Sequence, residues 1–222
     1  MNTSQGTASW HQQRVGKITG SVIHNIMSNK VNSLSRAKLL KVLALERLSG
    51  TPTKNIVTEP MARGLRLESD AREAYEAINQ KVDLVGFIDH PSINLAGCSP
   101  DGLVGDDGLI EIKCLNHKNH DQIIKKDSIP KQYFIQIQFQ LACSQRSWCD
   151  FVLYHPELAE TLYVKRVYPD QVVIKDMTQK IILFLDEVRQ AHLQIKKTNA
   201  DEAYKLSLIH ISEPTRLLSI SY

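Results

Sequence analysis

A chain of 222 residues with 42% hydrophobic and 23% charged residues is long enough for a globular domain with a buried core, and it lacks an apolar run that could span a membrane. The net charge of +3 permits nucleic-acid binding without requiring it, because binding depends on where basic side chains cluster. The N-terminus is unlike a signal peptide, and the cysteines form no C-x-x-C pair, so we expect free thiols in a cytoplasmic protein.

The first segment after the polar N-terminus carries several groups that can bind anions. Ser21 is a suitable N-cap for a helix that extends to about Ser28, and a helix N-terminus attracts negative charge. Arg14, Lys17 and the hydroxyl of Thr19 lie nearby in the sequence. The segment therefore fits a phosphate site, although taken alone it favours a capped helix with solvated basic side chains.

Two longer helices follow. The first is predicted over Ser35–Leu48, and its basic side is typical of a solvated face but could also contact DNA. The second runs over Glu59–Gln80 and carries Glu68 near its middle, where an exposed side chain is the ordinary expectation. Apolar residues at helical spacing predict a buried stripe on this second helix, formed by Leu65, Ala71, Ala74, Tyr75 and Ile78.

Short strands are predicted next, over Val82–Asp89 and Leu95–Gly97, and a hairpin follows them. Asp106-Asp107-Gly108 forms the turn of this hairpin, and Gly108 is expected to supply the positive φ that such turns need. The second strand of the hairpin is predicted over Leu109–Cys114, with its isoleucines directed into the core.

The hairpin brings Asp101 beside Glu111 at one edge of a small sheet. Glu111 and Lys113 project together, because residues two apart in a strand share a face. Two carboxylates bind Mg²⁺ through oxygen atoms, and a lysine next to the metal can position or deprotonate an attacking water. With Pro100 before it, Asp-x9-Glu-x-Lys matches the PD-(D/E)xK nuclease motif. The motif alone fits equally well an Asp-rich hairpin with a surface ion pair.

Helices and strands alternate in the second half of the chain. A solvated polar loop is predicted at Asn116–His120, and a helix begins at Pro130. Gln132, Gln136 and Gln140 fall at i, i+4 and i+8 and line one face of this helix, which either orients a water or phosphate or is half-exposed surface. The remaining predicted elements are strands over Trp148–His155 and Thr161–Tyr168 and a helix over Gln171–Lys197.

This order of elements predicts an α/β fold with a central mixed sheet flanked by helices. Residues 1–204 are expected to form a single nuclease domain. The stretch 205–222 has no period that would pack on the preceding helix, and it is similar to a translated sequencing adapter. We therefore expect 205–222 to be a non-native tail.

Five separated blocks of the sequence resemble the phage lambda exonuclease family, the YqaJ-type viral recombinases. They follow the family's order between Ser9 and about Lys197, and agreement across five blocks is more specific than the catalytic motif alone. The resemblance implies a restriction-endonuclease-like core of the PD-(D/E)xK superfamily. The blocks are Trp10-His11-x-x-Arg14-x-Gly16-x-Ile18-Thr19-x-Ser21, Gly64-x3-Glu68-x-Asp70-Ala71-Arg72, Cys98-Ser99-Pro100-Asp101-Gly102, Glu111-x-Lys113-Cys114 and Gln136-x-Gln138.

The resemblance also implies roles for individual residues. Lys113 would position or activate the water, and Gln136 would orient the nucleophile or Lys113. The groups implied to bind Mg²⁺, for which Mn²⁺ can substitute, are Asp101, Glu111, Glu68 and the backbone carbonyl of Ile112. The groups implied to hold a 5′-phosphate are Arg14, Ser21 and Ser99.

The implied activity is digestion of one strand of double-stranded DNA from 5′ to 3′, which leaves a 3′ overhang for recombination. The resemblance implies a homotrimeric ring that works beside a single-strand annealing protein. It also implies a phage or prophage gene that acts in the cytoplasm of a bacterial host. An alternative with the same two-metal site is a restriction-like or structure-specific endonuclease, which would cut closed circular DNA. A non-catalytic DNA-binding module is disfavoured, because all the acidic and basic site residues are present.

Overall fold

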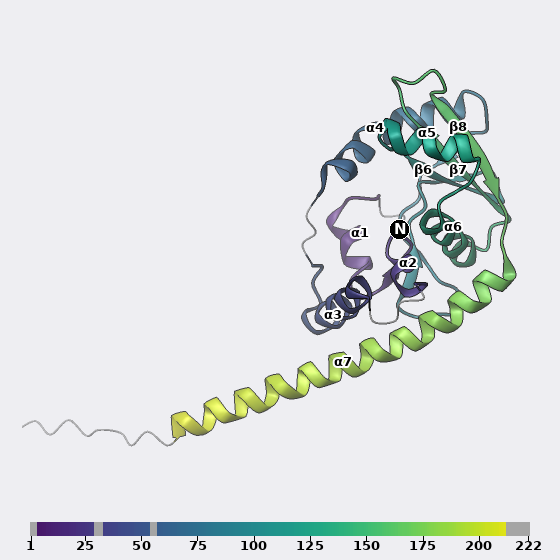
Figure 1. Ribbon diagram of the computed structural model, residues 1–222. Coiled ribbons are helices and arrows are strands. Elements are labelled where there is room, and N and C mark those ends of the chain that lie inside the picture. The colour runs from purple at the N-terminus through teal and green to yellow at the C-terminus, as the bar shows by residue number, and fades with distance from the viewer. Residues whose placement is uncertain (1–3, 29–32, 54–56, 212–222) are drawn as a thin grey trace, which may run out of the picture.

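The computed structural model of the chain describes residues 4–28, 33–53 and 57–211, which form a mixed α/β fold (Figure 1). Within them, the larger sheet has the order β2-β5-β6-β7-β8 and the smaller sheet has the order β1-β4-β3. The strands of the larger sheet are β2 (Val82–Asp83), β5 (Gly102–Val104), β6 (Gly108–Lys113), β7 (Trp148–Tyr154) and β8 (Leu162–Val167). Those of the smaller sheet are β1 (Ile18–Thr19), β3 (Ile88–Asp89) and β4 (Ala96–Cys98).

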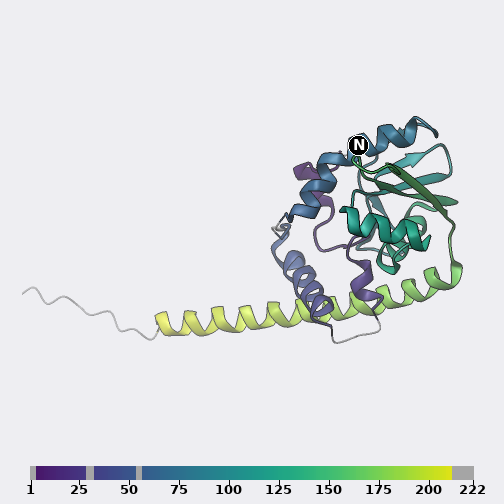
Figure 2. The same ribbon diagram turned by 45° about the horizontal axis from the view of Figure 1, so that its top comes forward.

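Helices surround both sheets, as the sequence predicted. They are α1 (Ala8–Gln13), α2 (Ile23–Ile26), α3 (Leu34–Ser49), α4 (Glu59–Glu76), α5 (His117–Lys126), α6 (Lys131–Ser144) and α7 (Gln171–Ile211). The last helix, α7, has 41 residues, and its C-terminal part projects away from the body (Figures 1 and 2). Closer to the body α3 packs against α7, and Arg36 of α3 pairs with Glu187 of α7 at 2.6 Å.

Alternation along the central strand β6 directs its side chains into two layers. Ile110 and Ile112 pack against α4, whose Tyr75 belongs to the same apolar cluster. Leu109 points to the opposite face of the sheet and packs with residues of α5 and α6. Phe139 of α6 packs instead with the smaller sheet, so α6 lies between the two sheets.

The pairing of β6 with β7 is parallel, whereas the other neighbours in the larger sheet are antiparallel. A parallel pair requires a crossover connection, and here the crossover consists of α5 and α6. The connection places α6 over the strand that carries the predicted Glu-x-Lys motif.

The stretch Val82–Asp89 is not the single strand that was expected. Its first two residues pair with β5 in the larger sheet, and its last two pair with β4 in the smaller sheet. Apolar alternation indicates extended backbone but does not identify the partner strand, so the local pattern did not reveal the division. This stretch is the connection between the two sheets.

His117–His120 form the start of helix α5, so the prediction of a solvated loop at Asn116–His120 is wrong. The side chain of Asn116 caps α5 by accepting a hydrogen bond from the backbone N–H of Asn119 at 3.0 Å. His120 is fully buried. The polar composition of the segment concealed both the helix and its buried side.

The buried stripe predicted on α4 is only partly confirmed. Ala71 and Tyr75 are buried, but Leu65 and Ile78 have exposed fractions of 77% and 71%. The helix ends at Glu76, so Ile78 lies beyond it. The apolar cluster that α4 shares with the sheet involves only residues from Leu67 onward, so Leu65 takes no part in it.

The hairpin turn lies where it was predicted, but a different glycine adopts the positive φ. That residue is Gly105, with φ +55°, whereas Gly108 is the first residue of β6. Gly108 is required for another reason, because a Cβ at this position would lie 2.2 Å from Cη2 of Trp148. Any residue other than glycine at position 108 would therefore require this indole to repack.

A buried polar network joins α4 to β7 and β8. The hydroxyl of Tyr75 donates to Asp150 at 2.6 Å, and Arg166 donates to the same carboxylate at 2.8 and 2.9 Å. Burial and the nearby Asp150 raise the pKa of Tyr75, so its hydroxyl stays protonated and remains a donor. The network fixes α4, and with it Glu68, on the sheet.

We expect Tyr75→Phe to lower the unfolding free energy by about 1.5–3 kcal/mol, because the buried Asp150 would lose a charge-assisted hydrogen bond. Urea unfolding followed by circular dichroism measures the change. Tyr168→Phe is a matched control, since Tyr168 is 63% exposed. Equal urea midpoints for Tyr75→Phe and the wild type would contradict the stabilising role of the network.

The predicted boundary at residue 204 does not coincide with the end of a helix, because α7 continues to Ile211. Residues 212–222 of the predicted tail lie outside the described residues. The division into a nuclease domain at 1–204 and a non-native tail at 205–222 stays a prediction. In the described part of the chain, no helix is long and apolar enough to cross a membrane.

Candidate active site

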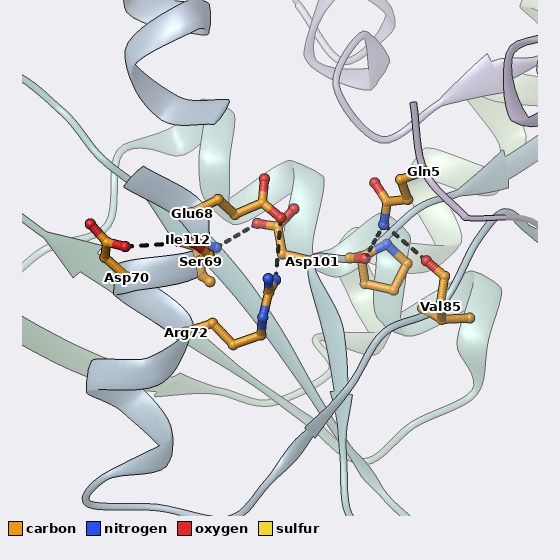
Figure 3. A network of polar contacts seen from close by, with 9 residues as sticks. Gln5, Glu68, Ser69, Asp70, Arg72, Val85, Asp101 and Ile112 are labelled. Atoms are coloured by element: carbon orange, nitrogen blue, oxygen red, sulfur yellow. Dashed lines mark hydrogen bonds and ion pairs between the residues drawn. The ribbon is translucent and has the colours of Figure 1, made fainter. Parts of the chain in front are cut away.

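The β5–β6 hairpin brings the two predicted carboxylates together. Asp101 directly precedes β5, and the pairing of Gly102 with Ile110 places it opposite Glu111. The backbone N–H of Ile112 donates to Asp101 at 2.7 Å and holds its carboxylate against β6 (Figure 3). Local strand pairing therefore determines the distance between the two acids.

Glu111 is almost completely enclosed, with an exposed fraction of 1%. Its Oε1 accepts hydrogen bonds from the ammonium of Lys113 and, at 2.6 Å, from the amide of Gln136. Its Oε2 accepts a hydrogen bond from the amide of Gln140 at 2.6 Å. A buried carboxylate needs such donors because its desolvation is otherwise costly. The donors from β6 and α6 hold Glu111 in one orientation.

Lys113 is half-buried, and its Nζ lies 5.4 Å from the centre of the Tyr133 ring. Burial lowers the pKa of this lysine, but the charges of Glu111 and Asp101 outweigh burial and raise it above its ordinary value. Lys113 is therefore an ammonium ion at neutral pH. A cation fixed at this place can stabilise negative charge on a phosphate group.

The carboxylates of Asp101 and Glu68 point toward one another, although they come from different layers of the fold (Figure 3). Glu68 belongs to α4, where it pairs with Arg72 at 3.4 Å. Burial raises the pKa of Asp101 well above its ordinary value, and the charges of Glu111 and Glu68 raise it further against the opposing charge of Lys113. A cation bound between such carboxylates would relieve their repulsion.

Oxygen donors of this kind are what hard divalent cations prefer. Among the residues that the structure describes, however, no three His, Cys, Asp or Glu side chains are arranged to hold a metal ion together. In this arrangement both oxygens of Glu111 accept hydrogen bonds. The donor set fits Mg²⁺ if the cation replaces the donors on one oxygen of Glu111.

A second polar region lies at the start of the chain. Arg14 and Ser21 line a cavity of about 150 Å³ together with Lys17 and Thr19. Burial lowers the pKa of Arg14, and the nearby carboxylate of Glu46 opposes this change. The cavity thus combines basic groups with hydroxyl donors, which is the chemistry that binds phosphate.

Ser99, the third predicted phosphate ligand, is connected to this region through Trp10. The indole N–H of Trp10 donates to Ser99 Oγ at 2.9 Å, and the guanidinium of Arg14 lies 4.0 Å from the centre of the Trp10 ring. Gly20 links the region to the carboxylates, since a Cβ at Gly20 would lie 3.5 Å from Cγ of Gln136. The role of Trp10 in ordering both side chains was not predicted.

The glutamines of α6 lie in three different environments. Gln136 and Gln140 both contact Glu111, whereas Gln132 is exposed. Gln138, which belongs to the fifth block of the resemblance, is buried elsewhere and donates to the carbonyl of Tyr168 at 3.0 Å. The i, i+4 spacing indicated that Gln136 and Gln140 share a face, but only the fold reveals that Glu111 lies opposite it.

Comparison with known proteins places this site in a family. Residues 9–147 match the YqaJ-like viral recombinase domain. The chain belongs to this family. The matched range contains the β5–β6 hairpin and α6 as well as Glu68, so the whole carboxylate site lies inside the YqaJ-like region. Among curated proteins, none matches the chain.

Solved structures agree with the YqaJ-like assignment. The alkaline exonuclease LHK-Exo from Laribacter hongkongensis is 37% identical, with a TM-score of 0.81 over 88% of this chain and 99% of that one. Its complex with dAMP gives a TM-score of 0.82 at the same identity and coverage. A phage-related exonuclease from Haemophilus somnus 129PT, 13% identical with a TM-score of 0.61 over 81% of this chain and 96% of that one, shares the fold. The family and the LHK-Exo similarity indicate that this YqaJ-like chain is a nuclease.

Proposed function

We propose that this YqaJ-like protein is a Mg²⁺-dependent exonuclease that degrades one strand of double-stranded DNA from 5′ to 3′ and leaves a 3′ overhang. The observation that carries the proposal is the buried, firmly held Glu111 beside Asp101 and the ammonium of Lys113. Phosphodiester hydrolysis needs a bound cation, an oriented water and positive charge near the phosphate, and these side chains can supply all three. The similarity to LHK-Exo supports the same class of reaction.

In the proposed mechanism the side chains divide the work between metal binding and charge stabilisation. Mg²⁺, for which Mn²⁺ can substitute, would polarise the phosphate and lower the pKa of a water molecule if it were bound by the carboxylates of the site. Lys113 would position or activate that water, or donate to a phosphate oxygen. Gln136, which donates to the same oxygen of Glu111 as Lys113 does, is proposed to orient the nucleophile or Lys113. The groups proposed to hold the cation are Asp101, Glu111, Glu68 and the backbone carbonyl of Ile112.

Arg14, Ser21 and Ser99 are proposed to bind the 5′-phosphate of the strand that is degraded. The cavity lined by Arg14 and Ser21 is next to α6, because the neighbouring Gly20 lies against Gln136, which donates to Glu111. A terminal phosphate bound there would present the neighbouring phosphodiester to the carboxylates. An enzyme with such an anchor acts at DNA ends and moves inward.

The proposed partners rest on the resemblance to the family and not on the geometry of the site. We propose a homotrimeric ring that encloses double-stranded DNA and a single-strand annealing protein that receives the 3′ overhang. A viral recombinase domain supports a phage or prophage gene that acts in the cytoplasm of a bacterial host.

Digestion of matched DNA substrates tests the proposal. Linear duplex with a 5′-phosphate, the same duplex with a 5′-hydroxyl, and a covalently closed circle would each be incubated with the protein and Mg²⁺. We expect fast release of mononucleotides from the 5′-phosphorylated strand, slower release from the 5′-hydroxyl strand, and an intact circle. A 5′ label should be released as a mononucleotide at once, whereas a 3′ label should remain on a strand that shortens progressively.

Two other outcomes would replace the proposal. Cleavage of the circle would indicate a restriction-like or structure-specific endonuclease that uses the same carboxylates. DNA binding without any cleavage, in either Mg²⁺ or Mn²⁺, would indicate a non-catalytic DNA-binding module.

A further inference from the structure

Gln140 contacts the central carboxylate of the site from its buried side. The residue lies one helical turn after Gln136 on α6 and is 1% exposed. Its Nε2 donates to Glu111 Oε2 at 2.6 Å, whereas Lys113 and Gln136 both donate to Oε1. The contact is therefore as short as that of Gln136 but reaches the opposite oxygen.

The two oxygens of Glu111 have different surroundings. Oε1 faces Lys113 and Gln136, which are both half-buried, so this oxygen lies toward the accessible side of the site. Oε2 faces Gln140 of α6, whose side chain is buried in the protein interior. A cation that enters from the accessible side would therefore meet Oε1, while Gln140 keeps Oε2 in place.

The amide of Gln140 keeps its orientation at a cost. Its Oε1 is buried and has no hydrogen-bond partner among the described residues, which is uncommon for a buried acceptor. Rotation of the amide by half a turn would point this carbonyl at the Glu111 carboxylate, and two acceptors would then face one another. The donation to Glu111 thus decides the orientation, even though an acceptor is left unsatisfied.

We propose that Gln140 is a positioning residue that fixes the Glu111 carboxylate so that Oε1 is directed at the catalytic cation. The inference rests on the proposed function, in which Glu111 is a metal ligand. Groups that orient a metal ligand typically change metal affinity by about 10- to 100-fold when they are removed. The role of Gln140 is therefore measurable as metal affinity, separately from cleavage.

Gln138 provides a matched control on the same helix. It is equally buried, with an exposed fraction of 0%, and it also uses its side chain in hydrogen bonds. Its partners are the carbonyl of Tyr168 at 3.0 Å and the backbone N–H of Asp170 at 2.7 Å, which belong to the connection between β8 and α7. Removing this amide perturbs the fold without touching Glu111.

The experiment compares Gln140→Met with Gln138→Met in the full-length protein. Direct Mn²⁺ titration, with free Mn²⁺ followed by electron paramagnetic resonance, gives the Kd, and thermal unfolding without metal gives the stability. We expect Gln140→Met to raise the Kd for Mn²⁺ by about 10- to 100-fold, with cleavage recovering at high Mn²⁺ concentration. Gln138→Met should lower the unfolding temperature but leave the Kd unchanged. Gln140→Asn, which is one methylene too short to reach Glu111, serves as the second variant if Gln140→Met does not fold.

The outcomes separate this inference from the proposed function. An unchanged Kd in both Gln140 variants, in a protein whose wild type cleaves DNA, would overturn the positioning role alone. An equal rise in Kd for Gln138→Met would also overturn it, because the effect would then reflect general loosening of α6. A wild type that binds Mn²⁺ through Glu111 but cleaves no DNA would overturn the nuclease proposal and leave the role of Gln140 intact.

Discussion

Lys113→Ala is expected to reduce DNA cleavage by about 100- to 10,000-fold while duplex binding persists. The ammonium of Lys113 is held beside Glu111, and the charges of the two carboxylates keep it protonated, so its removal takes away positive charge that no group on β6 replaces. Single-turnover digestion of 5′-phosphorylated duplex measures the rate, and fluorescence anisotropy in Ca²⁺ measures binding.

The control for this variant is Lys180→Ala. Lys180 lies on α7, where its ammonium pairs with Asp176 at 2.7 Å, and it has no contact with the carboxylates in the described structure. The Lys180→Ala variant should cleave DNA at the wild-type rate. Full activity of Lys113→Ala, or an equal loss in both variants, would contradict the proposed mechanism.

Asp101→Asn should have opposite effects on metal binding and on stability. Without the carboxylate, we expect the affinity for Mg²⁺ to fall by more than about 100-fold. That value is the upper end of the loss caused by removing a group that only orients a metal ligand. In the presence of a chelator, however, the variant should be more stable than the wild type, because burial and the charges of Glu111 and Glu68 disfavour the ionised Asp101. Mg²⁺ should raise the unfolding temperature of the wild type and not that of the variant.

The pH dependence of stability gives a second test of the same residue. The pKa of Asp101 is raised in the folded protein, so unfolding releases a proton once the pH exceeds the ordinary value near 4. With chelator present, the unfolding free energy of the wild type should therefore fall relative to Asp101→Asn, by up to about 1.4 kcal/mol per pH unit, until the folded carboxyl itself ionises. Above that pKa the difference should be constant. Parallel stability curves for the two proteins across this range would contradict the assignment.

The acidic pair and its lysine were predictable from sequence because a hairpin with a short turn determines its own register. Asp101 and Glu111 face each other for this local reason. Glu68 was different: its place on a helix made an exposed side chain the ordinary expectation, and only the resemblance directed it to the site. The fold turns it toward Asp101 because Tyr75, two turns later on α4, is fixed to Asp150.

Other features depended on contacts between distant segments. The local pattern of Val82–Asp89 was correct as extended backbone, but the choice between β5 and β4 as partners is made by the rest of the chain. His120 was expected to be solvated, yet it packs beside His155 with ring centres 5.8 Å apart. Gln140 gains its contact only when α6 meets β6, and Trp10 only when α1 meets Ser99. Spacing alone could not distinguish Gln140 from the exposed Gln132.

The topology of the sheet implies an order in which the site is assembled. The antiparallel hairpin of β5 and β6 closes through residues 105–107, so the acidic pair can meet early at a low entropic cost of loop closure. The parallel pairing of β6 with β7 must wait until the α5–α6 crossover has formed. Gln136 and Gln140 arrive with this crossover. During folding, the hairpin therefore carries its carboxylates before the hydrogen-bond donors of α6 are in place, and cations in solution can assist its closure.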